Sequence, residues 1–138
     1  MVVTRRQQVS TRGQGDAHDL TDVVARAVAE SGVTAGTVTV FVVGSTATVT
    51  TIEFEPGAVS DLNRLLDDLA PRDGEYRHHL RWHDDNGSSH VRAALMGPSV
   101  TIPFVDGKLL LGTGQQITLL ELDTRARQRE VVFQIVGD

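Results

Sequence analysis

The chain has 138 residues, the length of a single domain spanning 1–138, and carries 18 acidic against 13 basic side chains. Its net charge of −5 argues against nucleic-acid binding, and its lack of cysteine excludes thiolate catalysis, disulfides and cysteine-based zinc sites. No apolar run is long enough to span a membrane or to act as a signal peptide, so we expect a soluble, cytoplasmic protein without membrane contact.

The N-terminal half alternates strand and helix patterns. Residues 1–10 are predicted to form a strand, followed by a glycine-rich turn at 11–16. A helix is predicted over residues 19–31, because apolar side chains recur there with the helical period. These apolar residues are Leu20, Val23, Val24, Ala27 and Val28. Two short segments rich in β-branched residues, 37–43 and 46–52, predict two further strands.

The middle of the chain is predicted to hold two helices separated by a loop. Residues 60–70 place leucines at helical spacing, and Pro71 ends that helix. Residues 72–88 have no regular apolar period and are predicted to be mainly loop. Residues 89–96 predict a second, short helix.

The C-terminal part is predicted to be a series of strands joined by short turns. Residues 99–105 and 108–111 flank an Asp-Gly pair that is typical of a two-residue hairpin turn. Residues 116–122 and 130–136 complete about seven strands and two or three helices. Short connections favour antiparallel pairing. The predicted fold class is therefore α/β of the α+β kind, with a mixed, largely antiparallel sheet and helices on one face.

The side chains best suited to chemistry gather in the predicted loop and just after it. They are His78, His79, His83, Asp85, Asn86 and His90. Histidine is a common metal ligand and a common acid or base near neutral pH. His83 and His90 with one carboxylate, from Asp85, Glu53 or Glu55, would supply three ligands for a divalent cation such as zinc or magnesium. His83, His90 and Asp85 are the candidate catalytic residues, and the alternative is that these loop histidines only face solvent.

Two short polar segments are candidates for binding phosphate. Ser88, Ser89 and Arg92 stand at the start of a predicted helix, where free backbone N–H groups and the helix dipole favour an anion. The alternative is that serine caps the helix while Arg92 is an ordinary surface residue. Ser45 and Thr46 follow a glycine between two strands, where small residues let a ligand approach the backbone, although a bulge or tight turn explains them equally well.

Three blocks in register resemble one known family, the YjbQ family, which is named for a secondary thiamine-phosphate synthase activity. The first is GSTATVTTIEFEPG at 44–57, and the second is WHDDNGSSHVRAALMGPS at 82–99. The third matches the family's hairpin followed by G-T-W-Q, through Ser99, Ile102, Phe104, Gly107, Gly112, Thr113 and Gln115. The chain departs from the family pattern at Gly114, where the signature has tryptophan, and at Ser88, where relatives often have histidine.

The resemblance implies an α/β domain with a largely antiparallel sheet that assembles as a homotrimer, with a site around the histidine-bearing loop. Its implied reaction joins a hydroxyethylthiazole phosphate to a pyrimidine pyrophosphate. We then expect a small phosphorylated partner and contacts to it from Asn86 and Gln115. The alternatives are a trimeric metal- or phosphate-binding protein without turnover, and an assembly protein whose histidines have no role.

No fingerprint for a larger organic cofactor is found in the sequence. Residues 112–114, Gly-Thr-Gly, lack the third glycine of a dinucleotide-binding loop and lead into a predicted strand. We therefore expect neither NAD nor haem.

Overall fold

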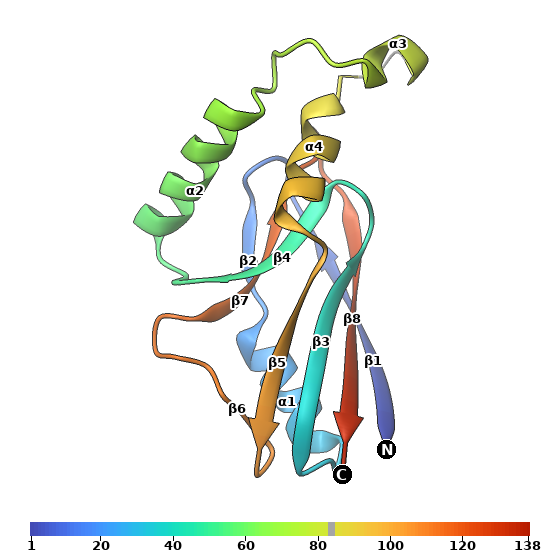
Figure 1. Cartoon of the computed structure of the whole chain (residues 1–138), viewed down its shortest axis with the longest axis vertical. Coiled ribbons are helices and arrows are strands. Elements are labelled where there is room, and N and C mark those ends of the chain that lie inside the picture. Colours follow the sequence, from blue (N-terminus) through green and yellow to red (C-terminus); the bar gives the residue numbers. More distant parts are fainter. Residues whose placement is uncertain (83–84) are drawn as a thin grey trace.

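The structure is a computed structural model of the chain that describes residues 1–82 and 85–138. Its strands form two sheets, where the sequence predicted one. The five-stranded sheet has the order β1 (Val2–Ser10), β8 (Gln128–Gly137), β3 (Ala35–Val43), β5 (Ser99–Val105), β6 (Lys108–Leu109). The three-stranded sheet has the order β2 (Ala17–Asp19), β7 (Gln116–Glu121), β4 (Ala47–Ile52). The strands pair antiparallel, which confirms the predicted fold class (Figure 1).

The main core lies between the two sheets and α1 (Thr21–Glu30). Side chains alternate across a strand, so Val38, Val40 and Val42 of β3 point inward and are completely buried. The core is filled from β3, β4, β7 and α1, for example by Val40, Val49, Leu119 and Val28. The helix predicted over 19–31 and the strand predicted over 37–43 are therefore confirmed in type, with ends that differ by a few residues.

The second helix, α2 (Pro56–Leu69), begins earlier than the predicted residue 60. Glu55 acts as its N-cap, because its carboxylate accepts hydrogen bonds from the backbone N–H groups of Gly57 and Ala58. Pro56 suits the first turn, where a backbone N–H has no helical partner. The leucines that predicted this helix are only partly covered, since Leu66 is buried but Leu65 and Leu69 are exposed.

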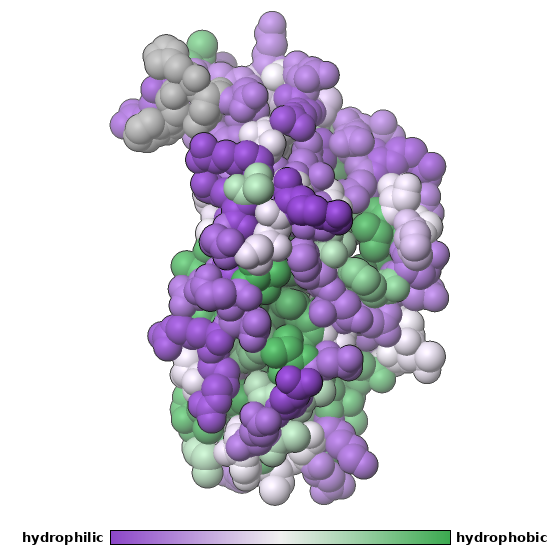
Figure 2. Space-filling view, turned by 180° about the vertical axis from the view of Figure 1, so that it is seen from behind, coloured by the Kyte–Doolittle hydropathy of each residue, from purple (hydrophilic) through white to green (hydrophobic). Residues whose placement is uncertain are grey.

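The predicted loop 72–88 contains a short helix, α3 (His78–Trp82), and α4 (Gly87–Met96) begins two residues before its predicted start. The two chain termini lie together at one end of the five-stranded sheet, and α3 and the start of α4 lie at the opposite end (Figure 1). From behind, hydrophobic side chains gather at the level of α1, whereas the end with α3 is mostly hydrophilic (Figure 2). The polar end is where the predicted site residues of the loop are found.

No helix within the described residues is long and apolar enough to cross a lipid bilayer.

Candidate functional site

A buried ion pair supports the polar end of the fold. Arg129 and Glu121 are 4% and 0% exposed, and the Arg129 Nε atom donates to Glu121 Oε1 at 2.8 Å. Arg129 Nη2 also donates to the Thr46 hydroxyl at 2.7 Å, and the Thr11 hydroxyl donates to Glu121 at 2.7 Å. The network joins the ends of β1, β4, β7 and β8. Thr46, which the sequence offered as a phosphate ligand, is thus buried inside this network instead of facing a ligand.

Asp123 connects this network to the histidine region. Its side chain is 1% exposed and accepts hydrogen bonds from the Thr46 hydroxyl at 3.0 Å and the Thr124 backbone N–H at 2.7 Å. Arg127 Nε lies 3.2 Å away, and Asn86 Nδ2 lies at 3.5 Å. Burial acts to raise the pKa of Asp123, but these donors outweigh it and lower the pKa below its ordinary value. Asp123 is therefore held as a carboxylate directly behind Asn86.

Two histidines meet in front of Asn86. The rings of His78 in α3 and His90 in α4 have centroids 4.4 Å apart with their planes inclined by 47°. His78 Nε2 lies 3.1 Å from Asn86 Oδ1. A third histidine, His79, accepts a hydrogen bond from the Gly87 backbone N–H through Nε2 at 3.0 Å. We call His78, Asn86 and His90 the histidine cluster. The contact of Asn86 with Asp123 and the hydrogen bond between Gly87 and His79 hold α3 and the start of α4 together around it.

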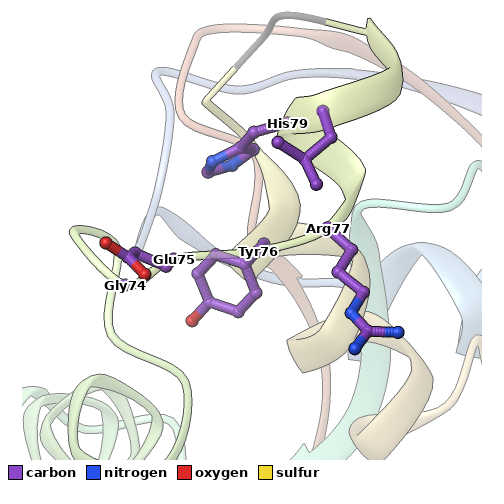
Figure 3. A pocket seen from close by; sticks show the side chains of 6 residues that line it. Gly74, Glu75, Tyr76, Arg77 and His79 are labelled. Atoms are coloured by element: carbon purple, nitrogen blue, oxygen red, sulfur yellow. The ribbon is translucent and has the colours of Figure 1, made fainter.

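Two cavities open beside the histidine cluster. A shallow one of about 610 Å³ runs along residues 74–80, where Glu75 and Arg77 project on opposite sides of Tyr76 and below His79 (Figure 3). A smaller one of about 160 Å³ is lined by Asp85, Asn86, Asp123, Thr124 and Arg125. Asp85, a predicted catalytic residue, thus lines the smaller cavity together with Asn86 and Asp123. His83, which was predicted as a catalytic residue and a metal ligand, lies outside the described residues.

The phosphate cradle predicted at the start of α4 is not exposed, which corrects the sequence-based expectation. Ser88 and Ser89 are completely buried, and neither hydroxyl has a hydrogen-bond partner among the described residues. Arg92 is 1% exposed; its Nε donates to the Ala70 carbonyl and its Nη2 to Asp67, both at 2.9 Å. The first turn of α4 packs inside the fold and Arg92 joins α4 to the end of α2, so none of these three side chains faces solvent.

The remaining predicted ligands lie elsewhere on the chain. Glu55 caps α2, and the Gln115 side-chain oxygen accepts a hydrogen bond from Gly112 N at 2.8 Å. Ser45 is exposed in the turn between β3 and β4. The start of α2 lies well away from the start of α4 (Figure 1). Across residues 1–82 and 85–138, no three histidine, aspartate or glutamate side chains gather closely enough to hold a metal ion.

Sequence reasoning missed the role of the turn before β8. Residues 123–129 read only as a charged connection between two strands, yet Asp123 and Arg129 are buried at the centre of the polar network. The signal that could have found them is the match between Asp123 and two donors close in sequence, Thr124 and Arg127. Their partners Thr46 and Glu121 come from other strands and carry no such local signal.

Comparison with known proteins reveals one family over the whole fold. A sequence model of the family described as "UPF0047 protein YjbQ-like" matches residues 5–138. A UPF0047 protein of Methanothermobacter thermautotrophicus is 33% identical over 136 residues, covering 99% of this chain and 93% of the relative. One from Mycobacterium bovis is 40% identical over 101 residues, covering 73% of this chain and 78% of the relative.

Solved structures give the same result. A YbjQ-like protein of unknown function from Sulfolobus solfataricus superposes with a TM-score of 0.89 at 28% identity, with 100% of both chains covered. A YjbQ/UPF0047 protein from Clostridium acetobutylicum superposes with a TM-score of 0.82 at 34% identity, covering 94% of this chain and 99% of the other. The resemblance seen in the three sequence blocks is thereby confirmed, and the chain belongs to the YjbQ (UPF0047) family.

Proposed function

We propose that this protein is a transferase that joins a thiazole phosphate to a pyrimidine pyrophosphate at the histidine cluster. The observation that carries the proposal is the contact between His78 and His90, anchored by Asn86 and backed by the buried Asp123 carboxylate. Two imidazoles held next to one another at a polar end of the fold can offer N–H donors to phosphate oxygens. The family resemblance supplies the reaction, and the cluster supplies the residues.

The proposed reaction needs stabilisation of a leaving anion more than it needs a base. The bond between the pyrimidine methylene carbon and its oxygen breaks, and the electron pair leaves on pyrophosphate. The thiazole nitrogen supplies its lone pair to form the new carbon–nitrogen bond. His90 donates a hydrogen bond to the pyrophosphate as its charge develops, and His78, whose Nε2–H donates to Asn86 Oδ1, holds the His90 ring in position.

A divalent metal would add further stabilisation of the pyrophosphate. The ligand set predicted from the sequence includes His83, which lies outside the described residues, and Glu55, whose carboxylate caps α2. No step of the proposed reaction is therefore routed through a metal.

Product formation from the two substrates tests the proposal. Mass spectrometry of wild-type reactions should detect thiamine phosphate, and His90→Ala should lower kcat/KM at least about a hundredfold, the range expected for a group acting on the transition state. Arg26→Gln, an exposed change on α1, is the matched control and should keep wild-type activity. Equal activity of His90→Ala and wild type would rule the histidine cluster out as the active site.

Binding without turnover is the second candidate. It is favoured by Gly114, which stands where the family signature has tryptophan and whose added Cβ would meet only Glu53, at 3.9 Å. A large aromatic wall is thus missing beside residues 53–55. Calorimetry showing saturable binding of the pyrimidine pyrophosphate, together with no product by mass spectrometry, would select this role. Gly114→Trp should then introduce measurable turnover.

We also propose that the chain forms a homotrimer in the cytoplasm. The outer face of the five-stranded sheet carries uncharged side chains such as Thr37, Thr39, Phe41 and Val43, and Phe41 and Val43 are 41% and 48% exposed. Among the described residues, no helix lies over this face in the view of Figure 1. Exposed apolar side chains such as Phe41 and Val43 support association through this face. Light scattering should give three times the 14.9 kDa mass of one chain, and a stable monomer at micromolar concentration would contradict the proposal.

A further inference from the structure

Arg92 at the start of α4 is buried, whereas the side chains of Arg12 and Arg72 are exposed around the turn between β1 and β2. That turn borders a depression of about 580 Å³. Its lining includes Arg12, Gln14, Asp16, Arg72 and Thr124. The turn is closed by two glycines with positive φ, Gly13 at 130° and Gly15 at 89°, which other residues rarely adopt. The sequence indicated this turn but gave it no function.

Several hydrogen-bond donors face this depression. The Arg12 side chain is 90% exposed and binds Asp16 through Nη2, which leaves other N–H groups of its guanidinium open to solvent. Arg72 lies across the depression, positioned by a hydrogen bond from Nη2 to the Thr124 carbonyl at 3.3 Å. Gln14 Nε2 is buried and has no acceptor among the described residues. An anion with several oxygens can accept hydrogen bonds from the guanidinium groups of both Arg12 and Arg72.

Asp16 is the only acidic residue among the described residues that line this depression, and its negative charge is compensated by its neighbours. Asp16 accepts hydrogen bonds from the Arg12 backbone N–H and guanidinium, each at 3.0 Å, and lies 2.8 Å from His18 Nε2. Its side chain is only 6% exposed, so its charge is compensated and turned away from solvent. The lining of the depression is therefore net positive on an otherwise acidic protein.

An apolar compartment continues from the depression. A second cavity of about 350 Å³ shares Arg12, Gly15 and Asp16 with it. Its far wall is formed by Ala17, Phe54, Pro56 and Val59, and by Glu55, whose carboxylate is bonded to the backbone N–H groups of Gly57 and Ala58. Cavities of this size suit small molecules, which bind through an apolar body and a few well-placed polar groups. The two compartments together have a cationic end and an apolar end.

We infer that this arginine groove, defined by Arg12, Gln14, Arg72 and the apolar wall of Phe54, Pro56 and Val59, binds a small molecule bearing a phosphate or diphosphate on a ring. The phosphate group lies between Arg12 and Arg72, and the ring lies against Phe54. The inference rests on the proposed function for its substrate class, and it gives the phosphate a site separate from the histidine cluster.

Calorimetric titration with inorganic pyrophosphate tests the groove. Wild-type protein should bind about one pyrophosphate per chain, and Arg72→Gln or Arg12→Gln should weaken binding about tenfold or more, the loss expected for one charge-assisted contact. Arg64→Gln on the exposed side of α2 removes the same charge and should bind like wild type. Unchanged melting temperatures of the variants verify that they fold. No saturable binding, or an equal loss for Arg64→Gln, would overturn the inference.

Two further outcomes separate the groove from the proposed reaction. If wild-type protein binds pyrophosphate through Arg72 but makes no thiamine phosphate, the groove stands and the proposed reaction fails. If it makes thiamine phosphate and Arg72→Gln leaves KM for both substrates unchanged, the reaction stands and the groove is refuted.

Discussion

At the scale of single residues, the buried carboxylate of Asp123 makes stability depend on pH. Its pKa is lowered in the fold, so its contribution to stability is fully present above the ordinary aspartate value and is lost as pH falls through the lower, folded value. We expect the free energy of unfolding to fall below about pH 4 and to fall less steeply in Asp123→Asn. Urea titrations between pH 2 and pH 7 give the free energy of unfolding as a function of pH for wild type and for Asp123→Asn. An equal decrease with falling pH in both proteins would contradict the prediction.

Arg92 separates a structural role from a ligand-binding role. Arg92→Met keeps the aliphatic packing but removes the donors to Ala70 and Asp67, leaving a buried carbonyl without its partner. We expect a loss of about 1.5–3 kcal/mol in urea unfolding, the cost of losing a hydrogen bond to a charged group. Affinity for pyrophosphate should stay at the wild-type value. Weakened binding with unchanged stability would restore the phosphate cradle at the start of α4.

At the scale of elements, the pairing of β3 with β8 depends on two glycines that lie opposite one another, Gly36 and Gly137. A Cβ at Gly36 would lie 2.0 Å from the Val136 carbonyl oxygen, which is backbone and cannot move aside without disturbing the strand pair. Gly36→Ala should therefore cost about 2–3 kcal/mol of unfolding free energy. Gly114→Ala, whose Cβ would meet nothing closer than 3.9 Å, is the control and should change stability little. Equal stabilities of the two variants would show that the strand pair tolerates the extra carbon.

The sequence predicted the type of an element correctly where the element is long enough for its apolar period to repeat. The β-branched residues of β3 and the apolar face of α1 gave the correct elements, because the core packs against those same residues. β2 has three residues and α3 has five, too few for a period, and neither was predicted. The early start of α2 came from Glu55, whose role as a cap depends on its backbone conformation.

At the scale of the whole molecule, the sequence could indicate which segment holds the candidate site but not which side chains would meet. His78, Asn86 and His90 are three of the six residues predicted as candidates in this segment, and the fold brings these three together. Ser88, Ser89 and Arg92 were predicted to face a ligand, yet α4 lies with its first turn inside the fold, an arrangement set by α2 and the sheets. The arginine groove joins residues 12–17, 54–59 and 72, which no local pattern connects.

The histidine cluster is the centre of this account, and the non-additivity of its two histidines is its most direct test. When two residues act as one unit, substituting both lowers the activity little more than substituting one of them. Steady-state kcat/KM for thiamine phosphate formation should be measured for wild type, His78→Asn, His90→Ala and the double variant. We predict that the double variant loses no more than about threefold beyond His90→Ala. Losses that multiply, or single variants as active as wild type, would show that the two rings do not form one site.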